Sequence, residues 1–404
     1  MWSCGEKKRK TLSSARRLQS NQISLHTTKI HTPQSGGPQQ PPIALKVNTV
    51  WRQSRLTIAI ARSVPVMVLS MARSAAFSFE DPISYQTAIR GAAVEMFVTV
   101  KGSFRAELMH IQFDKLCMQY ARENLPRVAH FAISPKRGGI VFLTDANQPA
   151  AQCCGMDVSS EAIVIVGAGS SGHVRSCDAC RWAGLALPVE DLSATGNALA
   201  GHELTEASST RLVYPNPARM ARLVRLRAAA QRLAEVTPDT LAHPEVSNTF
   251  KHELMHAMVA CLADEAPAKP TSGWRHHTVI INRFEKVLAA NSDRPMHLAE
   301  ICAAVGASER TLEICCEEHL GMGPIRYLWL RRMHLVRRSL IQADPSSTTV
   351  TQIATGHGFW ELGRFAVSYK ELFEESPSAA LHRPARDLRT IQDRPRGFAD
   401  SKFA

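Results

Sequence analysis

Two helix-turn-helix patterns in the last third of the chain constrain its fold more than any other feature. The first unit extends from His297 to Gly321 and the second unit from Val350 to Pro377. Their second helices align at an offset of 53 residues, which pairs Leu312, Cys316, Leu320 and Pro324 with Phe365, Tyr369, Phe373 and Pro377. Apolar residues at this spacing form the inner face of a helix. A motif built twice on one chain predicts two contacts with one ligand, and the usual ligand of this motif is the major groove of DNA.

The local signals in the first unit agree with this interpretation. A short apolar helix face from Leu298 to Val305 is followed by Gly306, which is expected to end the helix. Ser308 is a favourable N-cap for the next helix, and Glu309 suits the positive end of its dipole. A longer connecting helix then begins with Pro324 in its first turn and is expected to run to about Gln342.

The connecting helix and the second recognition helix carry the basic residues expected of a DNA-binding surface. No acid before Asp344 opposes the five arginines of the connecting helix, which are Arg326, Arg331, Arg332, Arg337 and Arg338. They suit phosphate contact, and the alternative is a solvated helix face, although such faces normally mix both signs of charge. In the second unit Glu361, Gly363, Arg364, Ser368 and Lys370 point outward, and an arginine early in such a helix can contact guanine or phosphate.

The second unit resembles the AraC/XylS family of bacterial transcription regulators. The matching residues are Thr349-Val-Thr-Gln-Ile-Ala354, Gly358-Phe-Trp-Glu-Leu-Gly-Arg-Phe365, Tyr369-Lys-Glu-Leu-Phe373 and Ser376-Pro377, within a similarity that covers about residues 285–385. The resemblance implies that each recognition helix enters the major groove while the connecting helix fixes their separation. It thereby implicates Ser308, Arg310 and Thr311 in the first unit, and Trp360, Glu361, Gly363 and Arg364 in the second. Glu309, Lys370 and the five arginines complete the predicted DNA-binding surface.

The first recognition helix departs from the pattern of that family. Ile314, Cys316 and Glu317 occupy its middle, where the family usually shows basic residues and a core aromatic. Glu317, together with Glu313 and Glu318, would repel phosphate. We therefore predict that the second unit and the connecting helix contribute more of the binding free energy than the first unit.

The rest of the chain predicts an α+β protein. Residues 73–204 contain short apolar or alternating runs bounded by turn residues, at Val94–Val100, Glu107–Phe113, Ile140–Leu143, Ala162–Val166 and Leu185–Val189. They favour a β-sandwich or small barrel, and in the family with this order the N-terminal half is often a cupin-like domain that binds an effector or dimerises. A helical connector (205–265), a linker (266–273), the all-α double helix-turn-helix domain (274–385) and a flexible tail (386–404) are expected to follow.

The basic charge of the chain lies mostly in its first segment. The formal net charge is +12, but residues 1–70 hold eleven lysines and arginines against the single acid Glu6, which leaves about +2 for the remaining 334 residues. Residues 1–72 are expected to form a disordered basic extension. Met67 and Met71 would serve as start sites, and we favour an extension that precedes the native start over a DNA-binding arm. The apolar stretch Leu56–Ala72 is too short to span a bilayer.

Three motifs suggest other chemistry. Gly167-Ala-Gly-Ser-Ser-Gly172 has the spacing of a dinucleotide-binding loop, but no amphipathic helix follows, so we expect a glycine-rich turn. His252-Glu-Leu-Met-His256 fits a zinc-hydrolase motif without a clear third ligand. Cys177 and Cys180, with Cys153 and Cys154 upstream, would suit a metal or redox role, although one C-x-x-C without a second is a weak signal.

The sequence therefore predicts a cytoplasmic, nucleoid-associated bacterial transcription regulator and not an enzyme, with no cofactor or bound metal. Its expected partners are operator DNA, a small-molecule effector, a second copy in a homodimer and, because we expect an activator, RNA polymerase. One alternative is a zinc- or dinucleotide-dependent enzyme in the N-terminal half that carries a DNA-binding domain. Another is a DNA-binding protein whose N-terminal domain only dimerises.

Overall fold

A computed structural model describes residues 72–201, 210–263, 272–291 and 296–383, all of which belong to one compact unit. The predicted basic extension, most of the predicted linker and the predicted tail lie outside these described residues.

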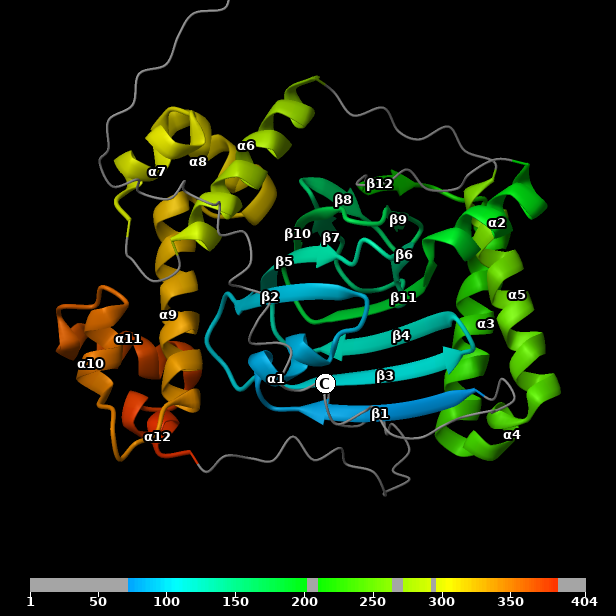
Figure 1. Cartoon of the computed structure of the whole chain (residues 1–404), viewed down its shortest axis with the longest axis horizontal. Helices are drawn as coiled ribbons and strands as arrows, with labels where there is room; N and C mark the ends of the chain where they lie inside the picture. Colours follow the sequence, from blue (N-terminus) through cyan, green and yellow to red (C-terminus); the bar gives the residue numbers. More distant parts are fainter. Residues whose placement is uncertain (1–71, 202–209, 264–271, 292–295, 384–404) are drawn as a thin grey trace, which may run out of the picture. The chain divides into compact units, whose positions relative to one another are not determined.

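The N-terminal half contains two antiparallel sheets (Figure 1). The seven-stranded sheet has the order β1 (Arg73–Phe79), β3 (Ala106–Phe113), β4 (Leu116–Glu123), β11 (Cys180–Pro188), β6 (Arg137–Leu143), β9 (Ile163–Val166) and β12 (Thr210–Val213). The five-stranded sheet has the order β2 (Ala92–Val98), β5 (Arg127–Ile133), β10 (Ser171–Ser176), β7 (Ala151–Cys153) and β8 (Met156–Val158). The five strand runs predicted from the sequence appear as β2, β3, β6, β9 and β11.

The two sheets share an apolar core. Met96 and Ala129 of the five-stranded sheet belong to the same buried cluster as Leu108, Val164 and Trp182 of the seven-stranded sheet. This face-to-face packing confirms the predicted sandwich. The glycine-rich segment after β9 is also a turn as predicted, because it leads directly into strand β10 rather than into a helix. The short helix α1 (Pro82–Ala88), capped by the Asp81 side chain, precedes β2.

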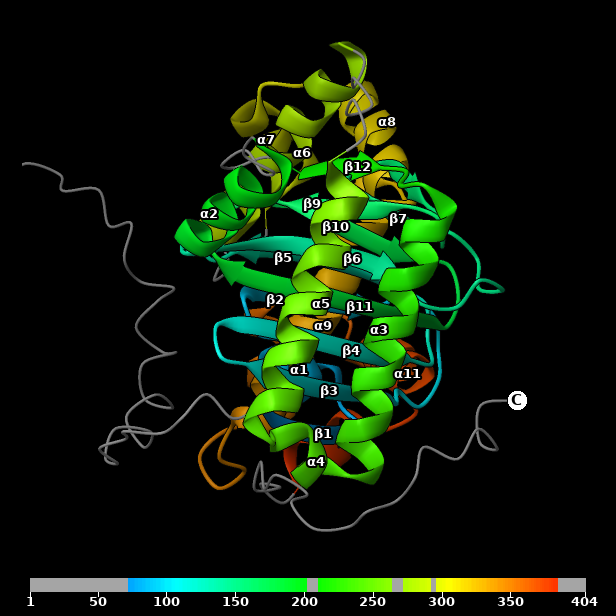
Figure 2. The same ribbon diagram turned by 90° about the vertical axis from the view of Figure 1, so that its right-hand side faces the viewer.

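Helices cover the other face of the seven-stranded sheet. They are α2 (Val189–Ala200), α3 (Pro217–Val236), α4 (Pro238–Ala242) and α5 (Pro244–Leu262), and α3 and α5 run side by side over the strands (Figure 2). The Phe113 ring of β3 stacks on the Phe250 ring of α5 with 6.2 Å between centroids. The helical segment predicted as a connector therefore contributes directly to the core of the N-terminal half.

The C-terminal half consists of α6 (Ser272–Ala290), α7 (Leu298–Val305), α8 (Glu309–Leu320), α9 (Pro324–Gln342), α10 (Val350–Gly356), α11 (Leu362–Phe373) and α12 (Pro377–Leu381). Figure 1 shows α7 and α8 at one end of α9, and α10 to α12 at the other. Buried residues of both units join one core through Tyr327, Leu330 and Met333 of α9.

The predicted helix boundaries in this half are confirmed. Gly306 ends α7 in the left-handed region with φ of 74°, a conformation that suits glycine. Ser308 Oγ accepts a hydrogen bond from the Thr311 backbone N–H at 3.1 Å, as an N-cap does. Pro324 occupies the first turn of α9, which ends at Gln342.

Candidate DNA-binding surface

The recognition helix of the first unit, α8, presents a mixed polar face. Ser308, Glu309 and Arg310 are exposed, and Thr311 is half-buried. The buried face of α8 is formed by residues such as Leu312 and Cys316 of the shared core. Its residues implicated by the family resemblance therefore lie at the exposed N-terminal turn of the helix.

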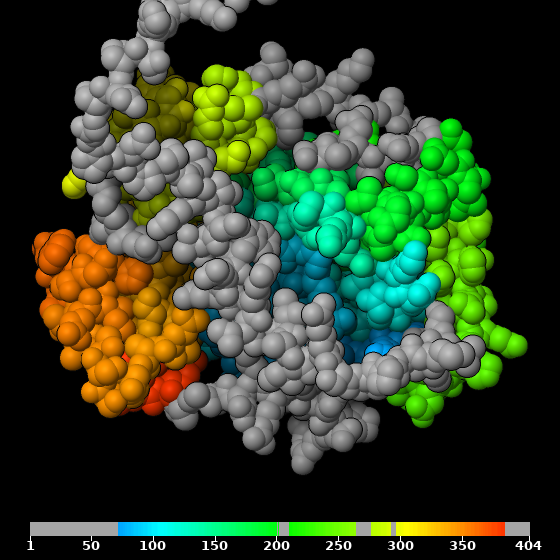
Figure 3. All heavy atoms as spheres, in the orientation of Figure 1, coloured from blue at the N-terminus to red at the C-terminus, as the bar shows by residue number. Residues whose placement is uncertain are grey.

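The recognition helix of the second unit, α11, presents a face that is more open and more basic. The Arg364 side chain is 85% exposed, and its Nη1 atom lies 2.7 Å from Glu361 Oε2, which is also largely exposed. Such a surface ion pair stabilises by at most about 1 kcal/mol, so Arg364 is easily available to a ligand. Trp360 is 76% exposed, and Gly363 and Lys370 are exposed as well. Figure 3 shows the atoms of α10 and α11 at the surface, in orange.

Three of the five arginines on α9 retain some exposure. Arg326 is exposed, and its guanidinium carbon lies 4.3 Å from the centroid of the Trp329 ring. Arg332 is half-buried over Phe359, with 5.5 Å to the ring centroid, and burial lowers its pKa. Arg338 is half-buried too. These three remain candidates for phosphate contact.

The other two arginines of α9 are buried and face acids. Arg331 Nη2 lies 3.4 Å from Glu95 Oε2 of β2, and Arg337 Nη1 lies 2.5 Å from Asp81 Oδ1. Arg337 Nε also donates to Glu375 Oε1 at 2.9 Å. Burial alone would lower the pKa of Arg337, but the two carboxylates raise it. The sequence placed all five arginines on one phosphate-binding face, whereas in this arrangement Arg331 and Arg337 bind protein carboxylates.

A buried polar cluster joins the same two halves of the compact unit. His173 Nε2 of β10 lies 3.0 Å from Glu285 Oε1 of α6, and the Tyr327 hydroxyl of α9 donates to the same oxygen at 2.7 Å. Burial would raise the pKa of Glu285, but the hydrogen bond and the charge of His173 lower it to about 2. No local sequence pattern indicates this cluster, because its members lie far apart along the chain.

Two exposed apolar residues were also missed as candidates for DNA contact. Ile314 of α8 is 48% exposed and Val367 of α11 is 59% exposed. Ile314 stood out only as a departure from the family pattern, and Val367 lies between outward-pointing polar residues. The 53-residue offset could have found them, because it places both at the same position of their helices.

The residues of the alternative chemistries do not converge. His252 and His256 of α5 are exposed, and Glu253 between them pairs with Arg222 of α3 at 2.6 Å. Burial raises the pKa of Cys180 to about 12, so its thiol lacks the low pKa of a reactive, redox-active cysteine. Among the described residues, no group of three or more His, Cys, Asp or Glu side chains is arranged to hold a metal ion.

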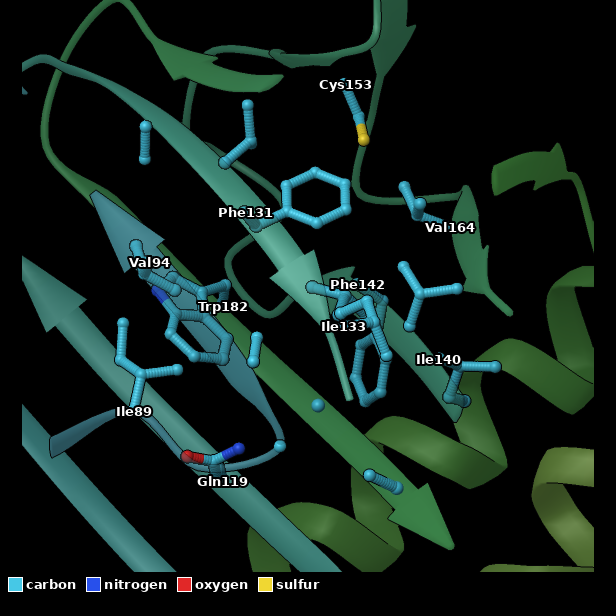
Figure 4. A pocket seen from close by; sticks show the side chains of 18 of the residues that line it. Ile89, Val94, Gln119, Phe131, Ile133, Ile140, Phe142, Cys153, Val164 and Trp182 are labelled. Carbon is cyan, nitrogen blue, oxygen red and sulfur yellow. The ribbon is translucent and has the colours of Figure 1, made fainter. Parts of the chain in front are cut away.

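An apolar cavity lies between the two sheets. The cavity has a volume of about 160 Å³. Figure 4 shows Phe131, Val164 and Trp182 among the side chains around it. Glu123 and Arg127 lie at its border as a buried ion pair, and Glu123 also accepts hydrogen bonds from the Tyr85 hydroxyl at 2.5 Å and from Trp182 Nε1 at 2.8 Å.

In the described part of the chain, no helix has both the length and the apolar character needed to cross a membrane.

Comparison with known proteins identifies the C-terminal half. Residues 301–383 match a family model described as a helix-turn-helix domain. Over 156 residues the chain is 34% identical to the "Probable thc operon regulatory protein" of Rhodococcus erythropolis, which covers 38% of this chain and 45% of that protein. Over 101 residues it is 33% identical to the XylDLEGF operon transcriptional activator 2 of Pseudomonas putida, which covers 24% of this chain and 64% of the activator.

The chain thus spans less than two thirds of each of these relatives. Among solved structures, the AraC-like transcriptional activator CuxR is similar over 70% of this chain and all of its own, at 16% identity and a TM-score of 0.35. With its tandem units and its open second recognition helix, the C-terminal half is similar to a helix-turn-helix domain and to that of transcription regulators such as these.

Proposed function

We propose that the chain is a sequence-specific DNA-binding transcription activator that acts in the bacterial cytoplasm at the nucleoid. The observation that carries the proposal is the exposed basic face of α11, where Arg364 is 85% exposed at the N-terminal turn and Lys370 follows on the same side. A guanidinium in this place can bind guanine in the major groove by two hydrogen bonds or can grip a phosphate. Both recognition helices pack against α9 in one shared core, so both would engage one operator.

The two units are expected to contribute unequally. The exposed face of α8 carries Glu313 and Glu317 beside Arg310, and these carboxylates repel phosphate. On α9 the contribution is assigned to Arg326, Arg332 and Arg338, because Arg331 and Arg337 are occupied by carboxylates. The second unit would therefore dominate binding.

The test is a binding titration on operator fragments recovered by genomic mapping of bound sites. We expect Arg364→Glu to abolish specific binding and Arg310→Ala to weaken it by about five- to tenfold, at the low end of the roughly 1–3 kcal/mol that one lost base or phosphate contact costs. Arg225→Glu is the matched control, because Arg225 is exposed on α3 and undergoes the same change of charge. Equal losses for Arg364→Glu and Arg225→Glu would refute the assignment.

The cavity between the sheets supports a small apolar effector. Its volume of about 160 Å³ is close to that of an engineered apolar cavity of about 150 Å³ in another protein, which stays dry and binds benzene. A ligand of one apolar ring would fill it, and its binding would shift the population of regulators able to occupy DNA. In this proposal the regulator binds adjacent half-sites as a homodimer and contacts RNA polymerase.

Thermal shift assays with small apolar ring compounds test the effector site. Val164→Phe fills the cavity from β9 and is expected to abolish any ligand-induced shift. Val279→Phe makes the same change at a residue that is 46% exposed on α6, and it should leave the shift intact. A shift that survives Val164→Phe would place the ligand elsewhere.

A further inference from the structure

Ile314 and Val367 are an exposed apolar pair at equivalent positions of the two recognition helices. They are separated by the same 53 residues that align Leu312 with Phe365 in the buried core. Their side chains are 48% and 59% exposed. A single exposed apolar residue needs no explanation, but the same exposure at the same place in both units indicates a shared role.

The surroundings of Val367 point to a polyanion with an apolar feature. On a helix, residues three or four positions apart lie side by side, so Arg364, Lys370 and the exposed Glu371 surround Val367 on the exposed face of α11. A ligand that covers Val367 therefore faces two cations and one acid, and it must offer an apolar group between them. DNA meets both requirements only where a base presents a methyl group in the major groove.

Gly363 supplies a second, independent observation on the same face. A Cβ atom built at this position would meet no other atom within 4 Å, so packing within the described residues does not demand a glycine. Its backbone φ is in the ordinary negative range, because Gly363 is absent from the residues with positive φ. A missing side chain one turn before Val367 allows the helix backbone to approach a ligand closely.

We infer that Val367 and Ile314 each contact the 5-methyl group of a thymine, one under each recognition helix. The inference rests on the proposed function, since it requires both helices to enter the major groove. Thymine alone among the four bases presents a methyl group there, and apolar side chains are its usual partners. Burial of one methyl-sized group contributes about 0.8 kcal/mol, which corresponds to about a fourfold change in affinity.

Deoxyuridine substitution tests the inference, because uracil keeps the base pair and the O4 acceptor of thymine and lacks only the methyl group. Each thymine of a selected operator is replaced in turn, and affinity is measured for the full chain. We expect one thymine under each helix at which the replacement weakens binding about fourfold. Val367→Ala should remove this sensitivity at one of the two positions, and Ile314→Ala should remove it at the other.

Val279→Ala is the matched control, since Val279 is an exposed valine outside the recognition helices and its loss should leave the uracil profile unchanged. Alanine has a higher helix propensity than valine or isoleucine, so both test variants are expected to fold. Equal losses on thymine and uracil probes for Val367→Ala would overturn the inference while leaving DNA binding established. If the wild-type chain selects no DNA sequence, the proposed function itself fails.

Discussion

Neutralising Glu123 is expected to destabilise the N-terminal half strongly. Glu123 is 3% exposed, and its carboxylate pairs with Arg127, which is 6% exposed. Glu123→Gln keeps the shape of the side chain but removes the charge, so the buried guanidinium loses its counterion. Breaking a buried ion pair from one side costs about 3–5 kcal/mol. The amide oxygen can still accept the hydrogen bonds from Tyr85 and Trp182, which share one acceptor oxygen, and we therefore expect a loss of about 4 kcal/mol in the free energy of unfolding, within the range for a broken ion pair.

Urea titration of the full chain measures this loss. Glu161→Gln is the matched control, because Glu161 is exposed in the same half and its neutralisation should change stability by less than about 0.5 kcal/mol. A double-mutant cycle with Arg127→Met should show coupling of about 1.5 kcal/mol or more, since the arginine costs less to remove once its counterion is gone. A loss below about 1 kcal/mol for Glu123→Gln would show that water screens the pair, and the reasoning from burial would be wrong.

Three further predictions concern acid stability, helix capping and the contact between the two halves. Burial, aided by Arg90, lowers the pKa of His110 to about 4. As the pH falls, His110 is therefore protonated in the unfolded chain before it is protonated in the folded chain. The free energy of unfolding should be retained above pH 6.5 and fall towards pH 4. At pH 5 protonation of His110 in the unfolded chain should cost about 2 kcal/mol, and urea titrations of His110→Gln should lack this loss. A variant with the same pH dependence as the wild type would contradict this. Ser308→Ala removes the N-cap of α8 and should cost about 1 kcal/mol, whereas Ser308→Asn should restore it. Asp81→Asn can keep its cap on α1 but loses the charge that faces Arg337, so hydrogen exchange of α9 should accelerate. The matched control Asp239→Asn, at an exposed residue of α4, should leave this exchange unchanged.

The sequence specified the C-terminal helices well because their ends carry local signals. Gly306, Ser308 and Pro324 act through their own backbone preferences and need no tertiary partner. The strands were harder to recognise. All eight residues of β4 are buried, including Gln119 and Arg122, so the strand shows no alternation of apolar and polar residues. Strand β10 was missed for a similar reason, since its buried His173 contacts Glu285 of α6, which lies 112 residues away in the sequence.

The candidate site shows the same division. Arg364 could be predicted because exposure follows from the period of its own helix. The burial of Arg331 and Arg337 could not, because their carboxylate partners Glu95 and Asp81 lie more than 200 residues away in the sequence. A run of arginines along a helix shows only that no acid lies nearby in sequence, whereas these two acids come from strand β2 and from the residue that caps α1.

The contacts of α9 determine how the DNA-binding domain behaves when it is cut away from the rest of the chain. Without the N-terminal half, Arg331 loses Glu95, Arg337 keeps only Glu375, and the His334 ring loses the Val98 carbonyl oxygen that lies 3.2 Å from its Nε2. Each cation that then neutralises a phosphate steepens the dependence of log affinity on log salt by about 0.9, without adding any preference for sequence. A truncated domain would therefore bind bulk DNA more tightly and choose its operator less well than the intact regulator.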